Sequence, residues 1–294
     1  KEPLRNSGEL AHSLTSIGMT GALDNNTTLN ASLVTDNRKA GLTIYGQNRV
    51  RDAYDHDDDG FVEIPVIKSQ TIGTQAYLKT SAYSKLTLDY HATNEYRRGG
   101  DQLDVPPHEA MIAETTDHLI NSGGLSFDGT SKDSKHRYSV FASAQSTKRD
   151  SYYGSGMDPN AYGNTHDLVV LGGAQYTLGI DNLLFMPAEF MAGAEYNHNY
   201  LHDITLGYDH DHLQKINIFS GFMQNEWRND TWGFLVGARI DKHSLVNNVI
   251  VSPRANIRFN PSKNANFRLS YSTGFRAPQA FDEDFHAAVV GGER

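Results

Sequence analysis

The chain contains no cysteine, and acidic residues outnumber basic ones. Without thiols, neither a disulfide framework nor a thiolate metal site can form. The 26 Lys and Arg residues face 35 Asp and Glu residues, which gives a formal net charge of −9. This balance argues against nucleic acid as a partner, because proteins that bind nucleic acid present a basic face. It is typical of a cation-binding or well-solvated protein.

Long hydrophobic runs are also missing. The longest, NLLFMPAEFMAGA at 182–194, is short and interrupted, so the sequence predicts neither a membrane-spanning helix nor a signal peptide. No helical stripe of apolar residues extends over three turns. The mean hydropathy of −0.53 would suit a soluble protein. A transmembrane β-barrel has a similar average, however, because only its alternate residues face lipid.

The dominant pattern is an alternation of apolar and polar residues with a period of two. Phe267, Leu269 and Tyr271, for example, alternate with Arg268 and Ser270. The clearest runs cover 232–240, 249–259 and 267–275, and further runs begin near Leu29, Leu42, Leu86, Tyr138, Leu168, Phe190 and Ile216. We expect roughly twelve strands of about 9–15 residues, enough to cross a membrane at a tilt. Strands of soluble sandwiches are shorter, about 5–6 residues.

The connections between these runs alternate in length. Short polar turns lie at 36–39, 80–84, 129–135, 179–182, 228–230 and 260–264, and longer polar segments at 52–65, 97–109, 150–166 and 199–213. An up-and-down barrel produces this alternation, whereas a Greek-key sandwich has no reason to show it. The sequence therefore predicts one all-β domain over 1–294, an antiparallel up-and-down transmembrane β-barrel. Its Tyr and Phe residues are either interfacial girdles or ordinary strand residues.

We also expect the chain to be a piece of a longer barrel. A membrane sheet cannot leave an open edge in hydrocarbon, and the strands counted here do not guarantee closure. The sequence begins at Lys1 without an N-terminal signature, and its last strand-like run leads into a loop.

Residues 247–286 carry a recognisable motif. Ser252, Pro253 and Arg254 lie on one predicted strand, and the next strand ends in Tyr-Ser-x-Gly-Phe-Arg-Ala-Pro at 271–278. This pair of segments resembles the barrel segment of TonB-dependent outer-membrane receptors. QNEW at 224–227 and the acidic loop YDHDDDGFVE at 54–63 are similar to members of that family from Bacteroidetes-type bacteria.

The resemblance implies that this chain forms about half of a barrel of about 22 strands. The plug domain and the TonB-binding segment of such receptors are not visible in this sequence. The resemblance further implies active import of a scarce metal chelate, namely a ferric siderophore, haem or cobalamin, across the outer membrane. Its partners would be outer-membrane lipid, the TonB complex, the receptor's own plug and a surface lipoprotein. The barrel pattern alone suits a passive porin equally well.

The Asp-rich loop at 54–63 predicts a calcium site whose ligands are oxygen atoms. Counted as positions one, three, five, seven and nine of a calcium loop, the candidate ligands are Asp55, Asp57, Asp59, the backbone carbonyl of Phe61, and Glu63. Gly60 at position six permits the sharp turn, but position twelve is Val66 and no helices flank the loop. The segment is therefore no EF-hand, and it needs a further oxygen, for which Asp52 is a candidate. The alternative is a solvated acidic loop without an ion.

Histidines gather around the segment 199–213. His198 and His202 end one predicted strand, and His210 and His212 begin the next. If the segment closes as a hairpin, the four imidazoles can converge on a metal or on haem iron to bind the substrate. The alternative is a polar loop without a ligand, because the spacing matches no defined metal-ligand pattern.

Four arginines lie on the polar face of the last strands, namely Arg254, Arg258, Arg268 and Arg276. By alternation they project into the lumen, towards the plug or an anionic ligand. Pairing with plug carboxylates is the favoured interpretation, because a sealed barrel must satisfy its buried polar surface. No catalytic triad, phosphate loop or supported carboxylate pair is present, so we expect no enzyme.

Three functions remain open: a TonB-dependent importer, a passive porin, and a soluble calcium-stabilised adhesin. One observation separates the last from the others. In a membrane barrel, Trp232, Phe259, Phe267 and Tyr271 point outward, whereas in a soluble sandwich they meet in a dry core between two sheets.

Overall fold

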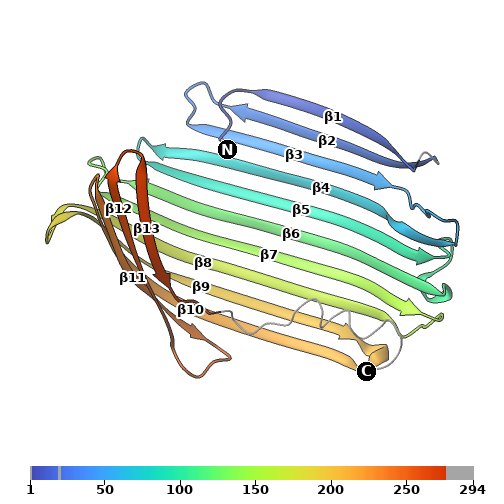
Figure 1. Ribbon diagram of the computed structural model, residues 1–294. Helices are drawn as coiled ribbons and strands as arrows, with labels where there is room; N and C mark the ends of the chain where they lie inside the picture. The colour runs from blue at the N-terminus through green and yellow to red at the C-terminus, as the bar shows by residue number, and fades with distance from the viewer. Residues whose placement is uncertain (1, 19–20, 276–294) are drawn as a thin grey trace.

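The computed structural model describes residues 2–18 and 21–275, and these form one sheet of 13 antiparallel strands in sequence order (Figure 1). The strands are β1 (Ser7–Ile17), β2 (Ala22–Val34), β3 (Ala40–Arg51), β4 (Phe61–Ser81), β5 (Ser84–Asp101), β6 (Ile112–Thr130), β7 (His136–Ser155), β8 (Tyr162–Leu183), β9 (Met186–Thr205), β10 (His210–Arg228), β11 (Trp232–His243), β12 (Ile250–Ser262) and β13 (Ala265–Ser272). Two short 3₁₀ turns, η1 (Pro107–Glu109) and η2 (Leu206–Tyr208), complete the regular structure. In these ranges no helix is long and apolar enough to cross a bilayer.

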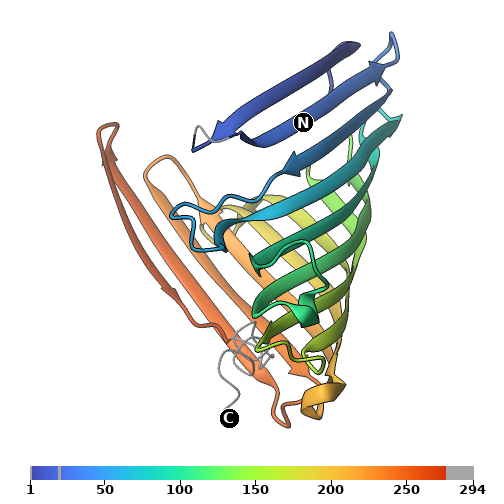
Figure 2. The ribbon, with the colours of Figure 1, turned by 90° about the vertical axis from the view of Figure 1, so that its right-hand side faces the viewer.

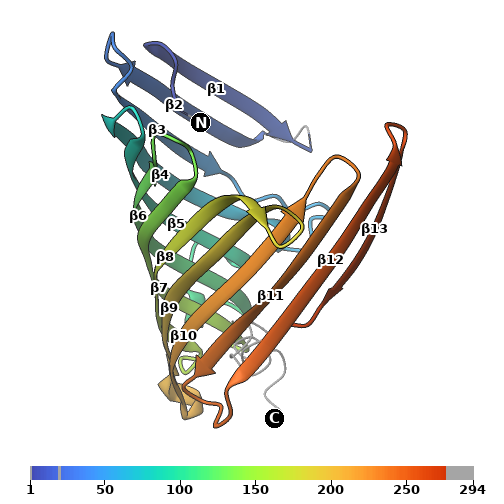
Figure 3. The same cartoon turned by 90° about the vertical axis from the view of Figure 1, so that its left-hand side faces the viewer.

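The topology confirms the predicted fold class. Each strand pairs antiparallel with its neighbours in the chain, as in an up-and-down barrel wall. The sheet curves strongly, but its edge strands β1 and β13 stay apart (Figures 2 and 3). There is no second sheet in the described part of the chain, and Trp232, Ile257 and Leu269 are 37%, 43% and 71% exposed. The predicted alternative of a soluble sandwich with these residues in its core is therefore wrong.

The strands are longer than predicted, reaching 22 residues in β8. The polar segments taken as long loops largely continue the ladders, which leaves connections of only 52–60, 102–111, 156–161 and 206–209. These strand ends contain polar residues at inward and outward positions alike, so their sequence looks like a loop. Antiparallel ladder hydrogen bonds nevertheless continue through them, because backbone pairing does not require an apolar face.

Most short turns lie where the sequence predicts them, but the one at 179–182 does not. Strand β8 continues to Leu183, and the turn consists of residues 184–185. Aromatic packing secures this apolar turn: the Phe185 ring stacks on Trp227 with centroids 5.8 Å apart. The Trp227 indole N–H donates a hydrogen bond to the Leu183 carbonyl at 3.1 Å. Contacts with a side chain distant in sequence thus stabilise this turn, which has none of the polar residues by which turns are recognised in a sequence.

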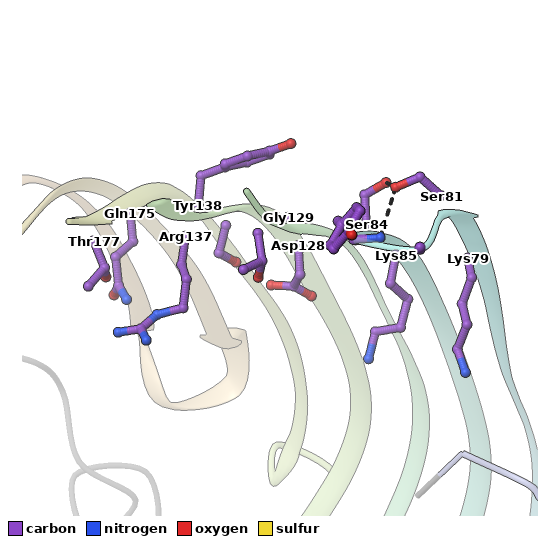
Figure 4. Close-up of a pocket in the computed structure, with 14 residues that line it drawn as sticks. Lys79, Ser81, Ser84, Lys85, Asp128, Gly129, Arg137, Tyr138, Gln175 and Thr177 are labelled. Atoms are coloured by element: carbon purple, nitrogen blue, oxygen red, sulfur yellow. Dashed lines mark hydrogen bonds between the residues drawn. The ribbon is translucent and has the colours of Figure 1, made fainter. Parts of the chain in front are cut away.

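The strands have an inward, concave face and an outward, convex face. Figure 4 shows the alternation directly: Tyr138 points to the convex side, and its neighbour Arg137 to the concave side with Lys79 and Lys85. Cross-strand partners extend the outward face, and aromatic rings stack along it, with Trp232 and Phe259 at 4.3 Å. The predicted outward positions of Trp232, Phe259, Phe267 and Tyr271 are confirmed, since they share this face.

The outward face carries a continuous belt without charged side chains, which we call the uncharged band. One member in each strand from β2 to β13 marks it: Leu29, Leu42, Ile72, Leu88, Leu125, Val140, Val170, Phe190, Met223, Val236, Ile257 and Leu269. In these described strands, no outward neighbour two residues before or after them is Asp, Glu, Lys or Arg. In β8 the apolar outward positions run from Leu168 to Leu178. That run measures about 33 Å along a tilted strand, or about 25 Å across a membrane.

The uncharged band lies against the rim with the shorter turns, which we call the short-turn rim. Connections there have two to five residues, against four to ten at the opposite, long-loop rim. Outer-membrane barrels keep short turns on the periplasmic side and longer loops outside. The strands therefore extend beyond the bilayer on the long-loop side, which accounts for their length.

Candidate functional site

The inward face is polar and ion-paired along its whole length. Near the short-turn rim, Glu2 bridges Lys79 and Lys85, with N–O distances of 3.3 and 3.0 Å. These lysines belong to a hollow of about 530 Å³ that also includes Asp128 and Arg137 (Figure 4). Glu2 thereby fastens the segment before β1 to strands β4 and β5, inside the wall.

A second network lies on β9 to β11. The Arg239 guanidinium donates to Glu195 at 2.6 Å and to Asp241 at 2.8 Å. Ser220 donates a hydroxyl hydrogen bond to Asp241 at 2.5 Å, and Asp241 is only 2% exposed. Alternation in the sequence places all four side chains on the inward face, but only the register brings them together.

A third network, in the half of the wall towards the long-loop rim, is centred on Asp203. Thr165 donates a short hydrogen bond to Asp203 and accepts one from Arg149 at 2.9 Å. Arg149 lies 3.5 Å from the same carboxylate, and His210 approaches its other oxygen at 3.2 Å. The side chains of Arg149 and Asp203 are only 14% and 8% exposed. This is the most buried ion pair of the described wall, and sequence reasoning did not identify it.

The third network belongs to a row of cross-strand partners that crosses eight strands. From β3 to β10 the row is Arg49, Ser69, Glu95, His118, Arg149, Thr165, Asp203 and His212. Arg49 also binds Asp24 of β2 with two guanidinium hydrogen bonds, and Arg97 beside the row binds Glu95. The row therefore presents donors and acceptors of both charges to the space that the wall surrounds. It is our candidate ligand-contact surface.

The acidic loop folds as a compact cluster of carboxylates. Asp55, Asp57, Asp59 and Glu63 each offer an oxygen within 4.8 Å of the others. Backbone N–H groups orient the loop: Gly60 donates to Asp55 at 2.8 Å, and His56 donates to Glu63 at 2.7 Å. Within the described chain, this is the group of His, Asp and Glu side chains close enough to hold a metal ion.

Two further oxygens were predicted near this cluster. Asp52 instead accepts a hydrogen bond from the Leu23 N–H at 2.9 Å, so its carboxylate secures strand β2. Phe61 begins β4 opposite Asp101 and donates its N–H to Asp59 at 2.8 Å. Its carbonyl stays a predicted ligand. One oxygen of Asp55 is buried and accepts no hydrogen bond.

The four histidines do not converge, which corrects the prediction of one imidazole site. Register pairs His202 with Leu213 and Asp203 with His212, so even-numbered residues of β9 share a face with odd-numbered residues of β10. His198 and His202 therefore point outward, where they contact Asn217 and Asp211 at 2.8 Å. His210 and His212 point inward, with ring centroids 6.4 Å apart. The backbone of the sheet lies between the two pairs.

The arginines of the last strands share the inward face. Arg254 donates to Gln224, and Arg258 donates to the Asn229 carbonyl at 3.1 Å. Arg268 is the direct cross-strand partner of Arg258. None of these three forms an ion pair with a described residue. Arg276 lies outside the described residues.

At the long-loop rim, three connections pack together on the outward side. Ala110, Ala113, Tyr152 and Ala161 form a buried apolar cluster, with Tyr208 of η2 against it. Asp158 joins the connections, because it accepts the Tyr208 hydroxyl at 2.7 Å on its carboxylate and the Tyr152 hydroxyl at 2.9 Å on its carbonyl. Burial, together with the hydrogen bond to Asp158, raises the pKa of Tyr208 to about 12.

The Tyr208–Asp158 contact gives a measurable prediction at high pH. The neutral hydroxyl is the donor, so its stabilising contribution is complete below the ordinary pKa of 10.0 and is lost as pH rises through about 12. We expect the phenolate absorbance of the wild type to include a tyrosine that titrates near pH 12, and this component to be absent in Tyr208→Phe. The variant should also be cut faster by protease within 156–161 at neutral pH. Tyr83→Phe, an exposed tyrosine at the opposite rim, should change neither; equal effects of both variants would contradict the assignment.

A family model described as "TonB dependent receptor-like, beta-barrel" matches residues 5–293. No curated protein matches the sequence.

Several solved structures are similar in fold. They include the siderophore receptor PirA of Acinetobacter baumannii (TM-score 0.75, 13% identity, 95% of this chain and 44% of that one). PirA of Pseudomonas aeruginosa gives a TM-score of 0.72 at 13% identity over 95% and 45% of the two chains. A mutant of the ferric enterobactin receptor PfeA of Pseudomonas aeruginosa, in complex with enterobactin, gives 0.71 at 12% identity over 95% and 45%. The chain spans less than half the length of each.

Proposed function

Because the chain belongs to the TonB-dependent receptor-like β-barrel family, we propose that it forms part of the wall of a receptor that imports a ferric siderophore. The family consists of outer-membrane receptors and transporters, not enzymes, and the chain is accordingly an outer-membrane protein. The siderophore, the coupling to TonB and the plug are parts of the proposal.

One observation carries the proposal: a wall whose outward face is uncharged over a membrane thickness and whose inward face is lined with ion pairs. The charged row ending at Asp203 and His212 lies towards the long-loop rim, where a ligand from outside would arrive. A passive porin would share the uncharged outward band. The family match favours the receptor, as does the likeness in fold to a siderophore receptor and a ferric enterobactin receptor.

The choice of ligand follows from the side chains of the inner wall. The four-imidazole site that would have favoured haem does not form, because His198 and His202 lie on the face of the sheet opposite to His210 and His212. Arg254, Arg258 and Arg268 carry positive charge with no ion pair to described residues. They suit carboxylates of a plug or an anionic chelate, and we propose the plug as their partner because a sealed barrel must satisfy its buried polar surface.

Uptake by the full-length receptor tests this function. Cells starved of iron and expressing the receptor should accumulate radiolabelled ferric siderophore, and a strain without TonB should not. A matched strain with the vector alone sets the background. Ion conductance in a planar bilayer together with TonB-independent uptake would identify a porin, and uptake of haem but not of any ferric siderophore would reject the ligand. The surface lipoprotein stays a proposed partner, tested by co-purification from outer membranes.

We also propose that the acidic loop binds one Ca²⁺. Four carboxylates whose oxygens lie within 4.8 Å repel one another unless a cation neutralises them. Carboxylate and carbonyl oxygens are the ligands that Ca²⁺ prefers, and the buried oxygen of Asp55 has no other partner. By the rule that longer loops face outside, the site lies on the exterior, where the ion would stiffen the connection between β3 and β4.

Calcium titration of the full-length receptor checks the site. We expect one site with a Kd of about 0.1–1 mM, the range of extracellular calcium modules. Asp57→Asn with Asp59→Asn should abolish binding, because it removes two charged ligands. Asp104→Asn, in a neighbouring loop at the same rim, should bind like the wild type. A wild-type receptor that shows no heat of binding and no thermal stabilisation in saturating Ca²⁺ would refute the site.

A further inference from the structure

The first charged residues beyond the uncharged band are lysines on four of the strands. They are Lys68 of β4, Lys148 of β7, Lys215 of β10 and Lys242 of β11, all at outward positions on the long-loop side. None of the four forms an ion pair with a described residue, whereas most basic side chains of the inward face do. The outward lysines are thus left to an anion outside the protein.

Lys242 lines a groove in the lipid-facing surface of β8 to β11, strands that run side by side (Figure 3), and Lys215 lies beyond the groove on β10. The small residues Gly172, Ala194 and Gly221 line the groove, and the larger side chains of Phe219 and Ile240 form its walls. Its volume is about 680 Å³. Phe219 is 61% and Ile240 52% exposed, so the groove is open towards the membrane.

Lys242 lies at the end of this groove, directly opposite Phe219 in the ladder. Its ammonium donates to the Val246 and Asn247 carbonyls at 3.1 and 2.8 Å. An ammonium has three donors, so one stays available. Lys215 lies four residues beyond Phe219 on β10, roughly 14 Å along the strand, with its Nζ 5.4 Å from the Tyr200 ring centroid.

We propose that this surface binds a phosphate-bearing lipid of the outer leaflet, with an acyl chain in the groove and its phosphates on Lys242 and Lys215. The groove is continuous with the uncharged band, so its occupant is an acyl chain. The two lysines lie just beyond that band, at the depth of lipid headgroups, and their charge selects an anionic lipid. The nearest outward carboxylate, Asp211, is already paired with His202 at 2.8 Å and does not neutralise them. This site is independent of the imported ligand.

Native mass spectrometry of the full-length receptor, loaded with lipid A and then exchanged into detergent, tests the site. We expect about one lipid A retained by the wild type. Lys215→Glu with Lys242→Glu should lower the retained fraction about tenfold, the effect of losing charge-assisted hydrogen bonds. Gly221→Leu should also lower it by filling the groove, and a Cβ there meets no atom within 4 Å, so the strand tolerates it. Lys68→Glu changes an outward lysine away from the groove, and this variant should retain lipid within about twofold of the wild type.

Each outcome decides the proposal. If the double variant retained as much lipid A as the wild type, or if Lys68→Glu lost as much as the double variant, the proposed site would be wrong. The second result would indicate nonspecific electrostatic attraction of lipid to all outward lysines. Equal retention of phosphatidylcholine by the wild type would overturn the requirement for an anionic lipid. If the double Glu variant does not insert, Lys215→Gln with Lys242→Gln keeps the test valid, because it removes the charges without adding new ones. Folding of every variant is checked by heat-modifiable migration in gels.

Discussion

Replacing Asp203 by alanine is expected to lower the free energy of unfolding of the full-length receptor by about 3–5 kcal/mol. The change leaves Arg149 buried without its counter-charge and removes the acceptor of the Thr165 hydroxyl. The loss is large because the environment of the pair screens little, with side chains 14% and 8% exposed. His210 loses a partner as well, but it is a third exposed and contributes less. Urea unfolding in lipid vesicles measures the change.

A second variant separates loss of the pair from loss of packing. Arg149→Met combined with Asp203→Leu removes both charges and retains volume, so its stability should return to within about 1 kcal/mol of the wild type, or exceed it. Asp203→Asn should be intermediate, because the amide oxygen still accepts from Thr165. A loss below about 1 kcal/mol for Asp203→Ala would show that Arg149 finds another partner and that the pair is not what holds this part of the wall.

Arginine placed on the uncharged band is expected to have the second largest effect. Ala142 faces outward in mid-band, with Leu125 and Gly172 as its cross-strand partners. Ala142→Arg should lower the free energy of unfolding by about 2–4 kcal/mol, the cost of a cation at the bilayer midplane of a barrel. Heat-modifiable gel migration and urea unfolding in vesicles report this as a reduced folded fraction.

The adjacent residue supplies the control. Ser143 is equally small and exposed, but it faces inward. Ser143→Arg should therefore cost less than about 1 kcal/mol, because the arginine stays among polar groups rather than lipid. Equal costs for the two variants would mean that both faces meet the same environment, and the assignment of a lipid-facing side would be wrong.

Much of the fold is readable from local patterns, and particular residues show why. The face of Trp232, Phe259 and Leu269 follows from alternation, because successive side chains in a strand point to opposite sides irrespective of partners. Strand ends were misjudged for the opposite reason: whether 199–205 continues a ladder depends on His210 and its successors across the hairpin. The turn after β8 was misplaced because Trp227, more than forty residues away, covers it.

Candidate sites divide along the same line. The acidic cluster was found from its spacing, because Asp55 to Glu63 lie within one loop whose geometry is local. The prediction that the four histidines converge was wrong, because nearness in sequence does not determine on which face of the sheet each side chain lies. The Arg149–Asp203 pair gave no sequence signal, since its partners are on β7 and β9, and even the inward position of both does not place them on one row.

The amino-acid sequence alone determined that this chain forms long antiparallel strands with one uncharged side. Side-chain alternation and turn chemistry act over a few neighbouring positions, so they can be read without the fold. Register, by contrast, is a property of strands already paired. Register alone aligned Arg149 with Asp203 through Thr165, placed the histidines on opposite faces, and set Lys242 at a groove of small residues with Lys215 beyond it. Those distances exist only after the strands lie side by side.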